Sequence, residues 1–292
     1  MIVGTYTALV TPFRDGAVDE KALAALVEWQ IESGVDGLVP VGTTGESPTL
    51  DFKEHVRVIE AVVEFTRRRV KVIGGSGANA TAEAIELTRA AEKAGADGSL
   101  QVAPYYNKPT QEGLYRHFKA IAAASKLPLV LYSIPGRCGI EIGVETCRRL
   151  AADCPTVVAI KEAGGTPDRV SRLRAALPSG FAVLSGDDSM TLPFMSVGAV
   201  GVISVASNVV PREVTEMVCA YAAGRLDAAR MAHARLADLF KDLFIETNPI
   251  PVKAALVMLG KIREEYRLPL CEMGRENRAR LEKTLRALGL LG

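Results

Sequence analysis

The sequence has few of the features that mark secreted, metal-binding or membrane-spanning proteins. Its 292 residues include five cysteines, an odd number without a C-x-x-C spacing, and three histidines, which are too few and too scattered for a zinc motif. No run of about 18 apolar residues is present, and the N-terminus lacks the basic and apolar segments of a signal peptide. We therefore expect reduced thiols, a cytoplasmic location, and neither a metal nor another cofactor.

Charge of one sign is also scarce. The chain has 35 Lys and Arg against 34 Asp and Glu, which gives a formal net charge of +1. The short basic run at residues 67–69 is interpreted as a solvated helix end. The hydrophobic share of 48% and the charged share of 24% are ordinary for a globular protein. We expect neither nucleic acid nor a membrane as a partner.

Short apolar runs alternate with helical patterns over the first three quarters of the chain. Continuous apolar runs are typical of parallel strands that are buried on both faces. Eight such units over this length favour a closed (β/α)8 TIM barrel over an open doubly wound sheet. The predicted strands, each followed by a predicted helix, cover residues 7–10, 37–41, 70–73, 98–102, 128–132, 157–161, 181–184 and 199–204.

The alternation stops after residue 224. Helices are predicted over residues 226–244, 251–259 and 277–288, with no strand between them. The chain is therefore predicted to contain a catalytic barrel over residues 1–224 and a C-terminal helical domain over residues 225–292.

One predicted strand ends in a lysine, Lys161. Lysine is rarely buried unless it is paired or has a function. Burial disfavours the charged ammonium and lowers its pKa, and a neutral amine can attack a carbonyl to form a Schiff base. The alternative is that Lys161 extends from the strand end to solvent.

Other reactive side chains follow neighbouring strands, at the end of the barrel where active sites lie. Tyr132 and Thr43 can move protons, and the guanidinium of Arg137 can bind a carboxylate with two hydrogen bonds. Backbone amides of residues 42–45 can hold a second carboxylate. Together with Lys161, this set indicates an imine-forming lyase or aldolase that acts on keto acids. Each side chain also has a structural alternative: Tyr132 as a core aromatic residue, Thr43 as a helix cap and Arg137 as a surface charge.

Three nearby carboxylates are interpreted as structural. Glu46 is predicted to order its loop by accepting backbone hydrogen bonds. Asp187 and Asp188 are adjacent, so their side chains should point apart, and we expect them to cap the following helix rather than form an acid pair.

The motifs, taken together, resemble those of one family. The sequence resembles the dihydrodipicolinate synthases (4-hydroxy-tetrahydrodipicolinate synthases) of the pyruvate-dependent class I aldolase superfamily. The resemblance implies a carbon–oxygen lyase with a TIM barrel. The matching segments, in family order over almost the whole chain, are residues 42–47, 104–109, 111–115, 132–137, 160–163, 184–188, 201–205 and 248–253.

The resemblance implies a role for each site residue. Lys161 would form the Schiff base with pyruvate, and Tyr132 and Thr43 would form a proton relay that Tyr106 completes from a neighbouring subunit. The pyruvate would be held by Thr44, Ile203 and Gly186. Arg137 would bind the carboxylate of L-aspartate 4-semialdehyde, and the product would enter the diaminopimelate route to lysine. Serine stands at position 133, where the family motif usually has asparagine, and we expect this departure to bear only on fine positioning.

The family resemblance also implies self-association and regulation. The expected assembly is a homotetramer, a dimer of dimers, with lysine as an inhibitor at the tight-dimer interface. Phe52 stands where a lysine-sensitive pattern can have histidine, so inhibition is expected to be weakened. The positions that match the inhibitor site are Ser47, His55, Asn79, Glu83 and Tyr105.

Two other functions are compatible with parts of this pattern. One is an N-acetylneuraminate lyase or a 2-keto-3-deoxy sugar acid aldolase, which shares the imine chemistry. Arg137 argues against it, because polyol substrates do not need a guanidinium there. The other is an inactive regulatory protein that binds keto acids, against which the presence of Lys161, Tyr132, Thr43 and Tyr106 argues.

Overall fold

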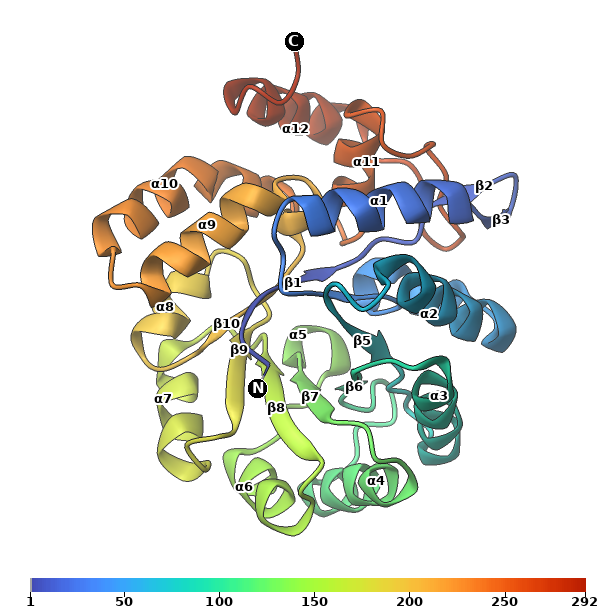
Figure 1. Cartoon of the computed structure of the whole chain (residues 1–292), viewed down its shortest axis with the longest axis vertical. Coiled ribbons are helices and arrows are strands. Elements are labelled where there is room, and N and C mark those ends of the chain that lie inside the picture. The colour runs from blue at the N-terminus through green and yellow to red at the C-terminus, as the bar shows by residue number, and fades with distance from the viewer. Residues whose placement is uncertain (1) are drawn as a thin grey trace.

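The computed structural model describes residues 2–292 and contains a closed barrel of parallel strands surrounded by helices (Figure 1). The order around the barrel is β1-β10-β9-β8-β7-β6-β5-β4, so the predicted TIM barrel is confirmed. The barrel strands are β1 (Gly4–Ala8), β4 (Gly37–Val39), β5 (Lys71–Gly75), β6 (Gly98–Val102), β7 (Leu129–Ser133), β8 (Val157–Glu162), β9 (Ala182–Ser185) and β10 (Gly201–Ser204).

Helices follow the barrel strands as predicted. The cap of α2 shows how local sequence sets a boundary, because the Asp51 carboxylate accepts a hydrogen bond from the Glu54 N–H and the Glu54 carboxylate accepts one from the Asp51 N–H. The buried residues of each helix recur every three or four positions and face the strands. The ring consists of α1 (Glu20–Glu32), α2 (Phe52–Thr66), α3 (Thr81–Ala94), α4 (Gln111–Ala124), α6 (Val144–Asp153), α7 (Pro167–Ala176), α8 (Thr191–Ser196) and α9 (Pro211–Ala222).

Several short elements were not predicted, because each spans only two to four residues, too few to show a helical or strand periodicity. A small hairpin, β2 (Phe13–Arg14) with β3 (Ala17–Val18), follows β1, and α5 (Pro135–Cys138) follows β7. Single 3-10 turns make up the rest: η1 (Thr43–Gly45), η2 (Ser47–Thr49) and η3 (Ala206–Asn208). The turn η1 and the helix α5 carry residues of the candidate site.

The C-terminal part of the chain is helical, as predicted, with α10 (Leu226–Asp242), α11 (Ile250–Met258) and α12 (Arg275–Ala287). In Figure 1, α11 and α12 lie outside the ring beside α1, and α10 lies beside α9. Residues 250–256 of α11 are all buried, so this helix belongs to the core. Among the described helices, none is long and apolar enough to cross a membrane.

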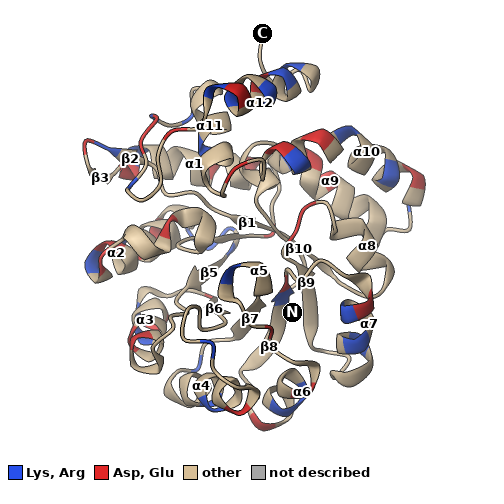
Figure 2. Cartoon of the chain, turned by 180° about the vertical axis from the view of Figure 1, so that it is seen from behind, with Lys and Arg blue, Asp and Glu red and all other residues tan. Residues whose placement is uncertain are grey.

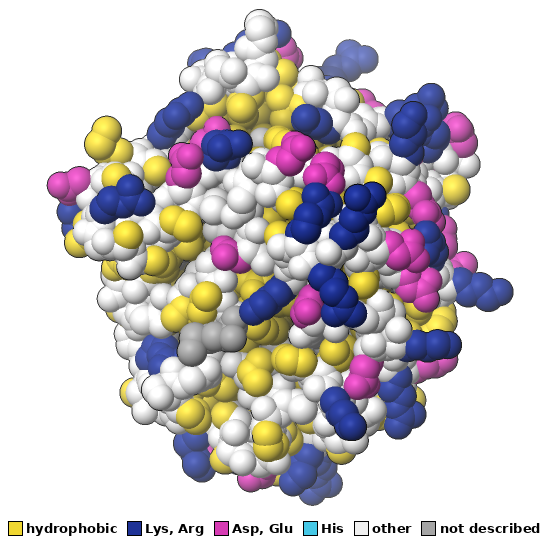
Figure 3. Space-filling model, viewed as in Figure 1, with side chains coloured by type: hydrophobic (Ala, Val, Ile, Leu, Met, Phe, Trp, Pro, Cys, Tyr) yellow, Lys and Arg dark blue, Asp and Glu magenta, His cyan; other side chains and the backbone are white. Residues whose placement is uncertain are grey.

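The barrel interior and the surface follow from the alternation of strand side chains. Val130 and Tyr132 of β7 and Ala159 of β8 belong to the apolar cluster inside the barrel. Lys161 lies two residues after Ala159 and therefore points into the same interior. Charged residues lie mainly along the outer helices (Figure 2), and charged side chains of both signs are interspersed on the face shown in Figure 3.

Candidate active site

Lys161 is buried inside the barrel, near the carboxyl end of β8. Its side chain is 5% exposed, so it does not extend to solvent. Tyr132 is its direct neighbour in the β7–β8 register, and the Lys161 Nζ lies 4.3 Å from the centre of the Tyr132 ring. The two strands thus bring an amine and a phenol together, although they are 29 residues apart in sequence.

The pKa of Lys161 is lowered from 10.5 to about 8, mainly because burial disfavours the charged form. The carboxylate of Asp188 opposes this shift, and the guanidinium of Arg137 adds to it. A substantial fraction of the amine is therefore neutral near physiological pH. This is the state in which an amine can attack a carbonyl.

Gly186 leaves space beside Lys161 and Ala163. A Cβ atom at this position would lie 2.9 Å from Cβ of Ala163, and 3.0 Å from Cε and 3.1 Å from Cγ of Lys161. The Gly186 N–H donates to the Glu162 carbonyl over 2.8 Å, which holds the end of β9 against the end of β8. A side chain at position 186 would therefore displace the Lys161 stem.

Tyr132 is protonated at neutral pH. Burial raises its pKa to about 12, while Arg137 and a hydrogen bond with the Thr43 side chain act in the opposite direction. Tyr132 and Thr43 also line the same small cavity of about 30 Å³. A neutral phenol beside a hydroxyl can donate a proton and receive one in turn, as a relay requires.

The other three substrate-binding candidates lie on separate elements around the barrel mouth. Thr44 is buried in η1, and its hydroxyl accepts a hydrogen bond from Asn248 Nδ2 over 3.0 Å. Ile203 is fully buried on β10 and faces the barrel interior. Arg137 lies on α5, and its Nη2 donates to the Asn248 carbonyl over 3.0 Å. Asn248 therefore contacts two candidate site residues.

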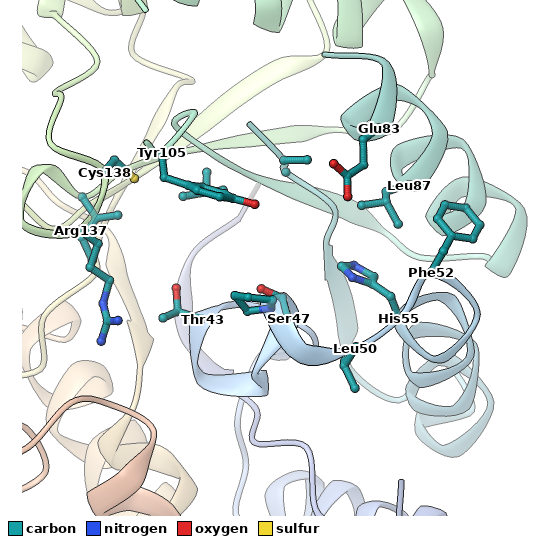
Figure 4. A pocket seen from close by; sticks show the side chains of 15 residues that line it. Thr43, Ser47, Leu50, Phe52, His55, Glu83, Leu87, Tyr105, Arg137 and Cys138 are labelled. Atoms are coloured by element: carbon teal, nitrogen blue, oxygen red, sulfur yellow. The ribbon is translucent and has the colours of Figure 1, made fainter. Parts of the chain in front are cut away.

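A cavity of about 390 Å³ joins Thr43 and Arg137 to most of the predicted inhibitor positions (Figure 4). The imidazole of His55 is buried, which lowers its pKa, and its Nε2 lies 2.6 Å from the Gly75 carbonyl oxygen. Because a carbonyl only accepts, that nitrogen carries the hydrogen. Asn79 supports this cavity by donating to the Tyr105 carbonyl over 3.3 Å. The predicted inhibitor positions that line the cavity are Ser47, His55, Glu83 and Tyr105.

Tyr106 does not join Tyr132 and Thr43 within this chain. Its side chain is 90% exposed, and its backbone has a φ of 71°, which is uncommon for a residue other than glycine. The adjacent backbone turns sharply, because the Asn107 N–H donates to the Tyr105 carbonyl over 2.8 Å. The loop thus presents a large aromatic side chain to the outside of the molecule.

The predicted helix-capping role of Asp187 and Asp188 is wrong. The residue before α8 is Met190, and no side chain caps that helix. Asp188 is buried and instead binds the end of β10, where it accepts hydrogen bonds from Ser204 Oγ (2.5 Å), Val205 N (3.0 Å) and Ala206 N (2.9 Å). These partners are brought near Asp188 because β9 and β10 are neighbours, so no local pattern reveals them.

The Glu46 carboxylate accepts a backbone hydrogen bond, as expected, but its partners lie in the C-terminal part of the chain and not in its own loop. It accepts the Arg267 N–H over 3.3 Å, and its other oxygen forms a buried ion pair with Lys253 Nζ. Neither Lys253 nor Asn248 was singled out from sequence chemistry. The one signal that could have found them was that both lie in the family-like segment 248–253.

The fold and the site define the class of protein. A buried lysine with a lowered pKa, at the mouth of a (β/α)8 barrel and beside a phenol, a hydroxyl and a guanidinium, is the arrangement of a lyase of the class I aldolase type.

Comparisons with known proteins identify the family. The model of the dihydrodipicolinate synthetase family matches residues 1–288. The 4-hydroxy-tetrahydrodipicolinate synthase of Persephonella marina is 53% identical over 292 residues, which is 100% of both chains. A solved structure of the enzyme of that name from Methylacidiphilum fumariolicum SolV is 54% identical, with a TM-score of 0.98 over 99% of this chain and 96% of the other. The chain belongs to the dihydrodipicolinate synthetase family.

Two further solved structures bear on ligands and assembly. The structure from Acinetobacter baumannii, described as complexed with pyruvate, is 46% identical, with a TM-score of 0.97 over 100% of both chains. A structure described as a monomeric dihydrodipicolinate synthase variant is 44% identical, with a TM-score of 0.97 over 99% of this chain and 98% of the other.

Proposed function

We propose that Lys161 is the nucleophile through which this chain condenses pyruvate with L-aspartate 4-semialdehyde. As a member of its family, the chain is a lyase with 4-hydroxy-tetrahydrodipicolinate synthase activity, which serves the diaminopimelate route to lysine. The observation that carries the assignment is the buried amine of Lys161, whose pKa is about 8 and whose Nζ lies against the Tyr132 ring.

The first half of the reaction activates pyruvate. The neutral Nζ of Lys161 attacks C2, and the carbonyl oxygen takes a proton from Tyr132 to give a carbinolamine. Loss of that oxygen as water leaves an iminium ion, and loss of a methyl proton converts the iminium ion to an enamine. Tyr132 and Thr43 exchange the protons at each step, which explains why a phenol of high pKa is useful beside the amine.

The second half joins the two substrates. The enamine carbon attacks the aldehyde carbon of the semialdehyde, and the aldehyde oxygen takes up a proton. The amino group of the substrate then attacks C2, so that Lys161 is displaced by transimination and the ring closes. Thr44, Gly186 and the backbone of Ile203 would hold the pyruvate part. The exposed guanidinium of Arg137, which lines the cavity, would bind the semialdehyde carboxylate.

We propose that Tyr106 completes the proton relay of a second copy within a tight dimer, and that two dimers form a tetramer. The support is the Tyr106 side chain, which is 90% exposed at the same end of the barrel as the site. Mixing a Lys161→Ala chain with a Tyr106→Phe chain tests the exchange. Activity above that of either parent is expected, because each mixed dimer regains one intact site. No gain in demonstrated mixed dimers would exclude the exchange, and sedimentation gives the assembly state.

We further propose that the cavity beside the site binds lysine as an inhibitor. The carboxylate of Glu83 and the hydroxyls of Ser47 and Tyr105 lie around the cavity (Figure 4) and fit an amino acid. Phe52 also lines it and offers no hydrogen bond, so we expect weak inhibition. Titration of the enzyme with lysine, compared with a Glu83→Gln variant, measures this effect.

We also propose that the chain has two domains, and we propose a cellular location for the protein. Residues 1–224 would be the catalytic barrel and residues 225–292 a helical domain, which is supported by the end of the strand–helix alternation at α10. The unpaired state of the five cysteines supports a reducing compartment, and we propose the cytoplasm.

Trapping of the imine tests the central assignment. The protein is incubated with pyruvate, reduced with borohydride and digested, and the modified peptide is identified by mass. Modification of Lys161 is expected, and its absence would refute the assignment. Comparing turnover of the semialdehyde with cleavage of N-acetylneuraminate tests the substrate, because faster sugar cleavage would favour the aldolase alternative.

A further inference from the structure

The loop that carries Thr43 and Thr44 is held between two unfavourable backbone conformations. Val41 and Glu46 both have a φ of 57°, in the left-handed region. This region is disfavoured for residues other than glycine, and most of all for a β-branched residue such as valine. Such conformations persist only where surrounding contacts enforce them. The contacts that enforce this loop are therefore part of what places the two hydroxyls.

The buried ion pair between Glu46 and Lys253 is one of these contacts. The two side chains are 0% and 1% exposed, and they join the residue that follows η1 to α11 across 207 residues of sequence. The Lys253 Nζ also lies 4.4 Å from the centre of the Phe13 ring and 5.1 Å from that of Tyr266. A buried ion pair adds little net stability compared with two well-packed apolar residues, but it does favour one geometry.

Other residues of the C-terminal part contact the same loop. Asn248, just before α11, donates to the Thr44 hydroxyl over 3.0 Å. The Arg267 N–H donates to Glu46 over 3.3 Å, while its guanidinium donates to the Thr49 carbonyl over 3.0 Å. Contacts from residues 248–267 therefore reach Thr44, Glu46 and Thr49. Among these contacts, the Glu46–Lys253 ion pair is the one that joins two charged and fully buried side chains.

We propose that Lys253 is a positioning residue for the reaction. Through Glu46 it holds residues 41–46 in the strained conformation that places Thr43 beside Tyr132 and Thr44 beside Asn248. The pair acts by geometry, because Lys253 contacts neither Lys161 nor the main cavity. The inference rests on the proposed roles of Thr43 in proton transfer and Thr44 in pyruvate binding.

A charge-free pair separates positioning from stability. The double variant Glu46→Gln/Lys253→Met removes both charges together, so no unpaired buried charge remains and its melting temperature should stay near that of the wild type. Loss of the ion pair should let the loop relax, and displacement by about 1 Å lowers kcat about a hundredfold. The KM for pyruvate should rise, whereas the KM for the semialdehyde should change less.

Two single variants complete the set. Glu46→Gln leaves Lys253 buried without its countercharge, so its melting temperature should fall below that of the double variant, and its kcat per trapped site should fall as well. Arg280→Met is the matched control, since it breaks a 2.7 Å ion pair between Arg280 and the buried Asp242 that is remote from the loop. It should alter the melting temperature without changing the ratio of kcat to trapped Lys161.

Rates are divided by the amount of Lys161 that pyruvate and borohydride trap, so loss of folded enzyme does not count as loss of kcat. A wild-type kcat per trapped site in the double variant would overturn the proposal. So would a loss no larger than that of Arg280→Met. Absence of trapping at Lys161 in the wild type would instead refute the proposed function, so the two failures are distinguishable.

Discussion

The lowered pKa of Lys161 leads to a quantitative prediction about reactivity. With a pKa of about 8 in place of 10.5, the neutral fraction of this amine at pH 7 is about 300 times that of an ordinary lysine. The rate of imine formation with pyruvate should therefore rise about tenfold per pH unit below pH 8 and level off above it. Samples quenched with borohydride at intervals, and analysed by peptide mass, give this rate.

Two variants should move this pH profile in opposite directions. Arg137→Ala removes a cation that lowers the pKa of Lys161, so the profile should shift to higher pH. Asp188→Asn removes a carboxylate that raises the pKa, so the profile should shift to lower pH. A wild-type rate that rises without levelling up to pH 10 would refute the lowered pKa. Shifts of the same sign in the two variants would refute the stated causes.

The same shift predicts how stability depends on pH. The unfolded lysine has the higher pKa, so the unfolded state binds more protons between about pH 8 and 10.5, and the free energy of unfolding rises with pH in that window. Below pH 8 the folded state bears the full penalty of the buried charge, at most about 3 kcal/mol. Lys161→Met should therefore stabilise the protein at pH 7, and the gain should vanish above pH 10.5. Denaturant unfolding at several pH values measures it, and a gain that grows with pH would contradict the reasoning.

The remaining predictions concern single contacts at the site. Tyr132→Phe removes the phenolic proton and should lower kcat by about 10²–10⁴-fold, as measured in the steady state; a variant with unchanged kcat would exclude Tyr132 from the relay. Gly186→Ala places a methyl group 3.0 Å from Lys161 Cε and should slow trapping, whereas the control Gly180→Ala, which meets no atom within 4 Å, should not. Arg137→Ala should raise the KM for the semialdehyde far more than the KM for pyruvate, and equal increases would contradict its assigned role.

The Glu46–Lys253 pair illustrates how the C-terminal helices relate to the barrel. Lys253 lies on α11, whose residues 250–256 are buried, and Asn248 precedes that helix. Asn248 contacts Thr44 of η1 and Lys253 contacts Glu46, the residue that follows η1 at the mouth of the barrel. The barrel strands place Lys161 and Tyr132, while the helical part completes the surroundings of Thr44. Removing the helical part should therefore disturb the site as well as the fold.

Local sequence patterns determined most of the architecture and the centre of the site. Strand and helix preferences depend on apolar spacing within windows of about 18 residues or fewer, so the barrel and the C-terminal helices could be predicted. The position of Lys161 at the end of an apolar strand left open whether its amine is buried or extends to solvent, and the hydroxyls and the guanidinium expected at neighbouring strand ends favoured a reactive amine. The residues around the mouth were then expected at the ends of neighbouring strands, because the order of a barrel is known once its strands are known.

Only the tertiary structure decided which distant groups meet. Asp188 binds the end of β10 instead of capping α8, and Glu46 pairs with Lys253 across 207 residues. The helix α5, which carries Arg137, is too short to leave a periodic pattern. A sequence window contains no information on such partners, because they are selected by how the strands close and how α11 packs. The reactive lysine was thus readable from the chain, whereas the contacts that tune and position its neighbours depend on the folded barrel.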